Sequence, residues 1–307
     1  MSLALGLDAG GTQTRWALMD GDGLVRATGA VGGLSAVQMN DEAGRAAVAH
    51  EFEQLAQQLR AQGALGRVCA GVTGAGAADE PSTLALQRAL AQALQLDPGA
   101  VQVCSDIELA YLSHFAPGAG YLVYAGTGSI AAFIDATGAL QRAGGRGAVL
   151  DDAGGGFWIA RQALRQIWRK EDEQPGAWRD SLLAQRVFEH IGSSDWAASR
   201  RFVYAAARGD MGQLALAVAA AAVQGDAQAL GLLQQAGVEL ARLGLALVSR
   251  FGPRPLALGG RAAQLHPLIA RSMAAALPAQ LSLQLVSVEA HLAAARRALC
   301  KPEASCA

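Results

Sequence analysis

Residues 8–14 read Asp8-Ala9-Gly10-Gly11-Thr12-Gln13-Thr14 and join two short apolar runs, Leu3–Leu7 and Thr14–Met19. Two such runs with a Gly-Gly pair between them are typical of a β-hairpin. Because glycine has no Cβ, backbone N–H groups in this turn can approach a phosphate closely, and threonine hydroxyls add further donors. Asp8, at the end of the first run, is suited to Mg²⁺, a cation that prefers oxygen ligands. A single Gly-Gly hairpin is also commonly just a turn.

A second turn of the same kind occurs at Ala125-Gly126-Thr127-Gly128-Ser129, between the runs Tyr121–Tyr124 and Ser129–Ile134. Two such loops could grip a polyphosphate. Residues 126–131 also satisfy the dinucleotide pattern G-x-G-x-x-G/A, but that pattern must open a helix. Here the following residues read as a strand that ends at Thr137-Gly138, so we do not expect a Rossmann fold.

Each loop opens a repeated pattern of three strands followed by helices and further strands. The first pattern continues with strands at 24–29, 67–72 and 101–104 and helices at 41–62 and 81–96. The second restarts near residue 120, contains long helical patterns over 157–250, and ends with strands at 255–258 and 281–286 and a helix at 290–299. The order predicts an α/β protein of two tandem β-β-β-α-β-α-β units. We expect domains at 1–116 and 117–307, with a helical insertion at about 160–250 and a last helix able to pack back on the first domain.

The charge balance and the lysine count exclude several classes of protein. The 307 residues carry 25 Lys+Arg against 26 Asp+Glu, a net charge of −1, which gives no reason to expect a nucleic-acid partner. The two lysines, Lys170 and Lys301, do not stand in a Gly-Lys-Ser/Thr sequence, so a P-loop is excluded and a Schiff-base lysine is not expected. We attribute the arginine excess to composition.

The remaining composition indicates a soluble protein of a reducing compartment. The longest purely apolar run, Leu214–Val223, has 10 residues, about half of the ~20 that span a bilayer. The first residues show no secretion signal, so we expect a cytoplasmic protein without a membrane partner. The cysteines lack C-x-x-C spacing and the five histidines are scattered, so we expect free thiols and no zinc site. The four cysteines are Cys69, Cys104, Cys300 and Cys306.

Five segments, in order along almost the whole chain, resemble the N-acetylglucosamine kinases. They are Asp8-Ala9-Gly10-Gly11-Thr12, Cys104-Ser105-Asp106, Gly126-Thr127-Gly128-Ser129, the stretch from Gly144-Gly145-Arg146-Gly147 through Asp152 to Phe157-Trp158-Ile159, and Leu258-Gly259-Gly260. Those enzymes belong to the superfamily of sugar kinases, actin and heat-shock chaperone ATPases. The resemblance implies a two-lobed ribonuclease-H-like (actin-like ATPase) fold, with a mixed five-stranded sheet and helices in each lobe. It also implies ATP and Mg²⁺ in a cleft between lobes and phosphoryl transfer to an amino sugar.

The resemblance also implies a role for each matching residue. Asp106 would be the general base that takes the proton of the sugar hydroxyl, although Ser105-Asp106 also suits a helix N-cap. Asp8 would lie at the Mg²⁺. The residues expected at ATP are Gly10, Gly11, Thr12, Thr14, Gly126, Thr127, Gly128, Gly259 and Gly260. The residues expected at the sugar are Ser35, Gly74, Asp106, Gly145, Arg146, Gly147 and Asp152.

Several positions depart from the family pattern. Arg146 replaces a tryptophan, Ala153 an acidic residue, Gly155 a serine, and Ser35 an asparagine. A site that changes its hydrogen-bonding groups discriminates strongly between analogues. The sequence therefore leaves N-acetylglucosamine, phosphorylated at its 6-hydroxyl, and glucosamine as alternative substrates.

Two other functions stay open. One is an activator ATPase of 2-hydroxyacyl-CoA dehydratases, which holds an iron–sulfur cluster through cysteines at a dimer interface, and the other is a non-catalytic sugar or nucleotide sensor. A homodimer is compatible with the sequence.

Overall fold

The computed structural model describes residues 2–300, which form two compact units. Unit 1 contains residues 2–116 and 288–300, and unit 2 contains residues 117–287. The last helix of the described chain groups with unit 1, although the rest of unit 1 ends at residue 116.

Unit 1 is built on a five-stranded mixed sheet in the order β3-β2-β1-β4-β5. The first three strands form an antiparallel meander, and β4 and β5 run parallel to β1. This confirms the strands expected from the alternation of apolar runs and turns. The bounds are β1 (Leu3–Ala9), β2 (Gln13–Met19), β3 (Val25–Gly32), β4 (Leu65–Val72) and β5 (Val101–Ser105).

Helices cover both faces of this sheet. Leu5, Leu7 and Ala9 alternate along β1 toward one face, where they join a core with α1 and α2. Ala4 points to the other face, which is covered by α3 and α10. The elements around the sheet are the 3₁₀ helices η1 (Ala36–Asn40) and η2 (Pro98–Ala100), and the α-helices α1 (Glu42–Leu59), α2 (Pro81–Leu94), α3 (Asp106–Leu112) and α10 (Ala290–Leu299).

Unit 2 repeats the same sheet topology. Its order, β10-β9-β6-β7-β8, matches that of unit 1 when read from the other edge, with an antiparallel meander followed by two parallel strands. The expected tandem repeat is therefore confirmed. The bounds are β6 (Tyr121–Ala125), β7 (Ser129–Ile134), β8 (Leu140–Gly144), β9 (Leu256–Gly259) and β10 (Leu283–Leu285).

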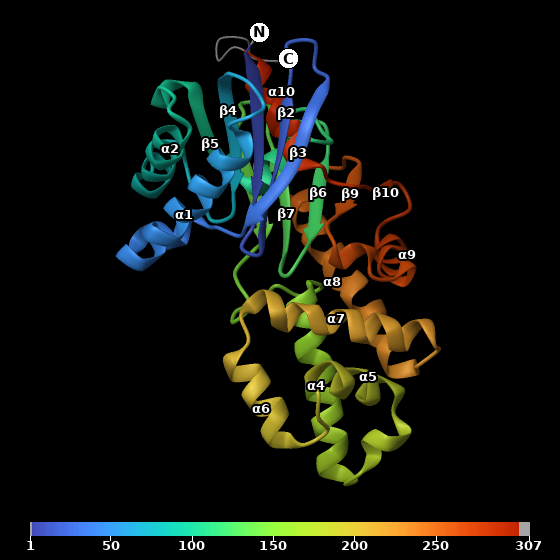
Figure 1. Cartoon of the computed structure of the whole chain (residues 1–307). Coiled ribbons are helices and arrows are strands. Elements are labelled where there is room, and N and C mark those ends of the chain that lie inside the picture. The colour runs from blue at the N-terminus through green and yellow to red at the C-terminus, as the bar shows by residue number, and fades with distance from the viewer. Residues whose placement is uncertain (1, 301–307) are drawn as a thin grey trace. The chain divides into compact units, whose positions relative to one another are not determined.

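A helical insertion separates β8 from β9 in unit 2. Its last helix packs against β6, β7 and β8, whereas α4 to α7 group together beyond the sheet (Figure 1). Within residues 2–300, no helix has the length and apolar character that crossing a membrane requires. The helices of the unit are α4 (Gly156–Glu173), η3 (Ala177–Asp180), α5 (Leu182–Ile191), α6 (Trp196–Ala205), α7 (Arg208–Val223), α8 (Ala227–Phe251), η4 (Ala262–Gln264) and α9 (Pro267–Ala276).

Helix α10 packs directly on β1 at Gly6. A Cβ at this position would lie 2.1 Å from the backbone N of Ala295 and 2.2 Å from the carbonyl oxygen of His291. Backbone atoms of a helix cannot yield as the end of a flexible side chain can. Gly6 therefore sets how closely α10 approaches the central strand, β1.

Gly6→Ala is expected to destabilise unit 1 by about 1–3 kcal/mol, the usual cost of overpacking a core. The midpoint of urea unfolding, followed by circular dichroism, should fall accordingly. Gly21→Ala is the matched control, because a Cβ at Gly21 meets no atom within 4 Å. Equal midpoints for the two variants would contradict the close packing of α10 on Gly6.

Candidate functional site

The predicted residues of unit 1 gather where three parallel strands end. Asp8 lies near the end of β1, Thr73 follows β4, and Asp106 follows β5. Because β1, β4 and β5 are parallel neighbours, their carboxyl ends meet at one edge of the sheet. Ligands of α/β proteins bind outside this edge, where strand order allows loops to diverge. The structure thus brings together residues that are separated by almost 100 positions in the sequence.

Asp106 is the first residue of α3, and three groups donate hydrogen bonds to its carboxylate, the longest being from the Ser105 hydroxyl to Oδ1 at 3.4 Å. The hydroxyl of Thr73 donates to its Oδ2 at 2.5 Å, and the backbone N–H of Ile107 donates to its Oδ1 at 2.8 Å. Burial raises the pKa of Asp106, while these hydrogen bonds oppose the rise and the nearby Asp8 adds to it. Ser105 is the N-cap residue of α3, so the alternative cap role does not fall on Asp106.

Asp8 forms an ion pair that the sequence gave no reason to expect. Arg15 lies opposite it in β2 and donates from Nη2 to Oδ2 at 2.7 Å. The Asp8 side chain is 18% exposed and that of Arg15 is 42% exposed. His291 of α10 lies near the pair, and burial together with Arg15 lowers the pKa of this histidine. Asp8 therefore lies at the edge of the sheet with its carboxylate partly exposed and paired with the Arg15 guanidinium.

The first glycine loop is a tight turn with an open outer side. The N–H of Gly10 donates to the carbonyl of Gln13 at 3.1 Å. Gly11 and Thr12 are exposed, and a Cβ at Gly11 would meet no atom within 4 Å. Thr14 differs from its expected role, because it lies opposite Ala9 on the core face and is 1% exposed. Thr12, but not Thr14, is available at the surface of this loop.

The segment around Ser35 crosses the ends of β1 and β4. The N–H of Leu34 donates to the carbonyl of Gly10 at 3.1 Å, and that of Ala36 donates to the carbonyl of Thr73 at 2.9 Å. Ser35 lies between these two anchors and is partly buried. Gly74, with a φ of +79°, follows Thr73 directly and is exposed. The structure therefore places Ser35 and Gly74 at the same edge as Asp106.

The predicted ATP residues of unit 2 lie at the ends of two neighbouring strands. The turn at 126–128 follows β6, and its Gly126 N–H donates to the carbonyl of Gly128 at 2.9 Å. Gly259 pairs with Tyr124 in the parallel ladder of β6 and β9. Gly260 has a φ of +98°, and a Cβ there would lie 2.3 Å from the carbonyl oxygen of Ala125. The two glycine sites of unit 2 are therefore adjacent.

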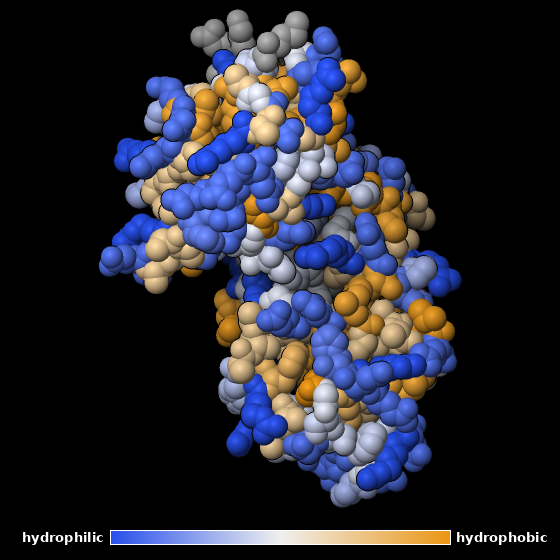
Figure 2. Space-filling model, viewed as in Figure 1, coloured by the Kyte–Doolittle hydropathy of each residue, from blue (hydrophilic) through white to orange (hydrophobic). Residues whose placement is uncertain are grey.

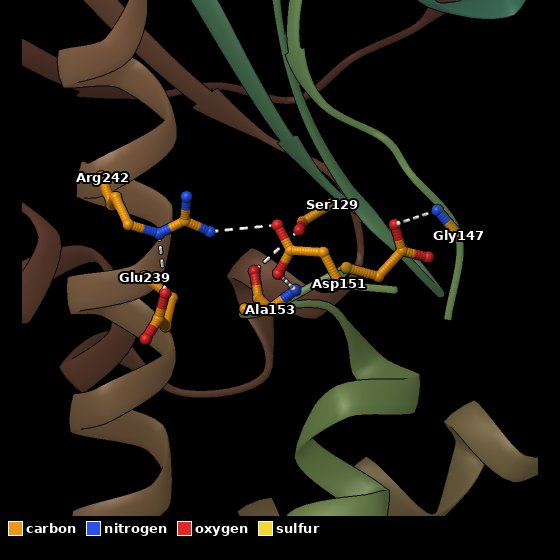
Figure 3. Close-up of polar contacts among 7 residues, drawn as sticks. Ser129, Gly147, Asp151, Ala153, Glu239 and Arg242 are labelled. Atoms are coloured by element: carbon orange, nitrogen blue, oxygen red, sulfur yellow. Dashed lines mark hydrogen bonds and ion pairs between the residues drawn. The ribbon is translucent and has the colours of Figure 1, made fainter. Parts of the chain in front are cut away.

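The beginning of α4 fixes the turn at 126–128. The N–H groups of Gly156 and Phe157 donate to the carbonyls of Gly126 and Thr127, both at 2.9 Å. The Ser129 hydroxyl donates to the carbonyl of Ala153 at 2.7 Å (Figure 3). The turn at 126–129 and the stretch 144–159, which are separate motifs in the sequence, are thus joined by hydrogen bonds into one assembly.

Asp152 is the most buried carboxylate of this assembly, at 2% exposure. Its Oδ1 accepts from the N–H of Gly147 at 3.2 Å, and its Oδ2 forms an ion pair with Arg208 at the start of α7. Asp152 has a φ of +57°, in the left-handed region that non-glycine residues rarely adopt. A Cβ at Gly128 would lie 2.4 Å from both the Asp152 Oδ2 and the Arg208 Nη2. This close approach explains the glycine at position 128.

Arginines of the helical insertion contact the segment 145–152 at three of its last five residues. Arg161 donates to the carbonyl of Ala148 at 3.0 Å, in addition to the Arg208 pair with Asp152. Arg242 of α8 contacts Asp151 at 3.1 Å and Glu239 at 3.0 Å (Figure 3). Gly145 and Gly147 have φ values of +65° and +87°, and Arg146 between them is exposed.

The sequence as a whole matches one known family. A sequence model of the BadF/BadG/BcrA/BcrD ATPase family matches residues 5–272. The chain belongs to this family. No curated protein matches the sequence.

Solved structures similar to this ATPase-family chain share its fold over nearly the full length. A candidate N-acetylglucosamine kinase from Chromobacterium violaceum is 23% identical, with 98% of this chain and 99% of that chain covered and a TM-score of 0.70. Another candidate N-acetylglucosamine kinase, from Porphyromonas gingivalis, is 17% identical, with 96% of this chain and 98% of that chain covered and a TM-score of 0.77. A ROK family glucokinase from Streptomyces griseus, in complex with glucose and AMPPNP, is 19% identical, with 96% and 98% covered and a TM-score of 0.60. The expected actin-like ATPase fold is confirmed.

The residues near Asp8 fit a Mg²⁺ that is held mainly by other ligands. Among residues 2–300, no group of three or more His, Cys, Asp or Glu side chains is placed to hold a metal. Mg²⁺ usually keeps several waters and takes one or two carboxylates together with phosphate oxygens. A single, partly open carboxylate such as Asp8 suits that mode of binding.

Cys69 and Cys104 of this family member do not suit a cluster shared between two subunits. Cys69 and Cys104 are buried side by side on β4 and β5, and their hydrogen bond lowers the pKa of Cys69 and raises that of Cys104. Cys300 is exposed at the end of the described chain. Cys306 lies outside the described residues.

Thr73→Val removes the hydroxyl that donates to Asp106 and is expected to raise the pKa of Asp106 further, because the charged carboxylate loses a donor. A ¹³C NMR titration of the aspartate carboxyl carbons measures this change. Thr12→Val is the control, since Thr12 is exposed in the loop after β1. An Asp106 pKa that is unchanged in Thr73→Val would contradict the hydrogen bond.

Proposed function

We propose that this protein is an ATP-dependent kinase that phosphorylates an amino sugar, with N-acetylglucosamine and its 6-hydroxyl as the first candidate and glucosamine as the second. The observation that carries the proposal is Asp106. This carboxylate has a raised pKa. It lies at the edge of the sheet where β1, β4 and β5 end and where the first glycine loop follows β1. Such an arrangement suits phosphoryl transfer, which needs an oriented hydroxyl, a nearby base and stabilisation of the phosphoryl charge.

Asp106 acts in this proposal as the general base. The hydroxyl of Thr73 and the N–H of Ile107 orient its carboxylate. A remaining lone pair of this carboxylate would accept the proton of the sugar hydroxyl. A pKa raised by burial makes the carboxylate a stronger proton acceptor than an exposed aspartate. The proton of the sugar hydroxyl moves to Asp106 as the hydroxyl oxygen bonds to the γ-phosphorus, while the bond between that phosphorus and the β,γ-bridging oxygen breaks and ADP leaves.

Backbone N–H groups and threonine hydroxyls would hold the phosphates. In unit 1 these come from Gly11 and Thr12, because the N–H of Gly10 already donates to the carbonyl of Gln13. In unit 2 they come from Thr127 and Gly128, because the N–H of Gly126 already donates to the carbonyl of Gly128. The proposal leaves out Thr14, because its hydroxyl is buried. Mg²⁺ held near Asp8, when bound with ATP, would neutralise charge on the phosphate oxygens. Gly259 and Gly260, buried next to Ala125, would let the adenine approach the backbone.

The sugar contacts would come from Ser35 and Gly74 in unit 1 and from the segment 145–152 in unit 2. An ionised carboxylate has about four lone-pair positions. Asp152 uses one oxygen for Gly147 and the other for Arg208, and so would share its remaining positions with a sugar hydroxyl. Arg146, exposed between two glycines in left-handed conformations, is the residue from which we expect a difference in sugar preference.

Assays of ADP release over a panel of sugars test the proposal. The panel contains N-acetylglucosamine, glucosamine, N-acetylmannosamine and glucose, and we expect turnover with an amino sugar. ATP binding without turnover on any sugar would reject the kinase and favour a sensor. Iron and a brown colour in the purified protein would favour the activator ATPase, against which the burial of Cys69 and Cys104 argues.

Asp106→Asn is expected to lower kcat at least about 100-fold while leaving sugar binding largely intact, because only the proton acceptor is lost. Coupled ADP assays measure kcat, and calorimetry measures sugar binding. In the parent enzyme, kcat/KM should fall as the pH drops through the raised pKa of Asp106, at a higher pH than for an exposed aspartate. A variant that keeps more than about a tenth of kcat would contradict the assignment.

A further inference from the structure

Arg208, the first residue of α7, lies against the turn at 126–128 as well as against Asp152. A Cβ at Gly128 would lie 2.4 Å from the Arg208 Nη2, so this nitrogen contacts the backbone of the turn. The Arg208 side chain is nevertheless 50% exposed, whereas that of Asp152 is 2% exposed. A guanidinium group thus lies at the surface beside the turn that is proposed to hold phosphates in unit 2.

The start of α7 is fixed by close packing against this turn and against α4. A Cβ at Gly212, one helical turn after Arg208, would lie 3.2 Å from the Thr127 Cγ2. A Cβ at Gly156 would lie 3.2 Å from the carbonyl oxygen of Gly212. Helix α4 is itself hydrogen-bonded to the turn through Gly156 and Phe157. The packed elements therefore hold the backbone of Arg208 in a fixed place beside the turn.

Arg208 has hydrogen-bond donors left for a second anion. A guanidinium group has five N–H donors. Within residues 2–300, Arg208 donates one hydrogen bond, from Nη2 to the Asp152 Oδ2, and forms no other ion pair. Asp152 therefore orients the guanidinium group without occupying all of its donors. Phosphate is a preferred partner of such a group, because two parallel N–H donors match two phosphate oxygens.

Arg208 also supplies a positive charge that the turn itself lacks. The backbone N–H groups of the turn and the Thr127 hydroxyl are neutral donors. Lys170, the one lysine within residues 2–300, lies in the last turn of α4, about 20 Å from the start of that helix. Figure 2 shows hydrophilic residues beside apolar ones on the visible face of the insertion, so hydropathy does not distinguish Arg208. Its contact with Gly128 does.

We propose that Arg208 binds the phosphates of ATP at the turn 126–128 and stabilises the negative charge of the phosphoryl group during its transfer. ATP as the ligand rests on the proposed kinase function. Asp152, which that function assigns to the sugar, holds Arg208 from the other side. One ion pair then joins the sugar contact to the phosphate contact within unit 2.

Calorimetry of nucleotide binding to the full chain tests this contact in a background without an unpaired buried charge. Arg208→Met alone leaves the buried carboxylate of Asp152 without its partner, a change that strongly destabilises proteins. Asp152→Asn is therefore compared with the double variant Asp152→Asn/Arg208→Met, and circular dichroism verifies that both are folded. Asp152→Asn is expected to bind AMPPNP with Mg²⁺ at least as tightly as the parent protein, because a carboxylate no longer offsets the charge of Arg208.

The addition of Arg208→Met is expected to weaken AMPPNP binding at least about tenfold, the size expected for a hydrogen bond to a charged group. The affinity for adenosine, which has no phosphates, should stay nearly unchanged. Equal AMPPNP affinities for the single and double variants would overturn the proposal. Equal losses for AMPPNP and adenosine would also overturn it, since the effect would then not depend on phosphate.

Arg242→Met is the matched control in the same Asp152→Asn background. Arg242 is 54% exposed, and its ion-pair partners within residues 2–300 are Asp151, which precedes Asp152, and Glu239. It thus contacts the same segment as Arg208 through the neighbouring carboxylate, and AMPPNP affinity should stay unchanged when it is replaced. A loss as large as that of Arg208→Met would assign the effect to the anchoring of the segment and overturn the phosphate contact.

These titrations contain no sugar and so separate the role of Arg208 from the kinase reaction. A parent protein that binds AMPPNP but phosphorylates no sugar would reject the kinase, and the comparison of variants would still decide whether Arg208 binds phosphate. A parent protein that does not bind AMPPNP would overturn both.

Discussion

The parallel alignment of β1, β4 and β5 is the constraint on which the candidate site of unit 1 depends. Parallel strands end at the same edge of a sheet, so the strand pairing by itself makes the loops that follow them converge. Asp8, Thr73 and Asp106 meet for this reason. The same pairing of β6 with β9 brings the turn at 126–128 next to Gly259 and Gly260 in unit 2. One rule of sheet topology, applied twice, positions most of the predicted residues.

Features set by local sequence could be predicted. The strands show alternating or continuous apolar residues between glycine turns, and the helices show apolar residues three and four positions apart. Both patterns are set by residues that are close in the sequence. The loop motifs could be found for the same reason, since a turn that lacks Cβ atoms is visible in the residues themselves. Asp106 was assigned from the resemblance to the N-acetylglucosamine kinases, and the structure places it directly after β5, at the start of α3.

Features set by distant contacts could not be predicted. The partner of Asp152 is Arg208, 56 positions away, and the partner of Asp151 is Arg242, 91 positions away. Neither arginine stands in a motif. Thr14 was assigned to the phosphates because it belongs to the loop sequence, but its register opposite Ala9 turns it into the core. Spacing along the chain does not reveal which face of a strand a residue occupies until the pairing is known.

The two repeats differ in the number of helices after their third strands, and some of the arginines that we attributed to composition have a structural role in the larger repeat. Unit 1 has one long helix between its third and fourth strands, whereas unit 2 has five helices at the equivalent place. Three arginines of that insertion, Arg161, Arg208 and Arg242, bond to three nearby positions in the segment 148–152. The chain that leads into this segment contains Gly144, Gly145 and Gly147, all with positive φ, and has little conformational preference of its own. The position of the segment therefore depends on cations supplied by the insertion.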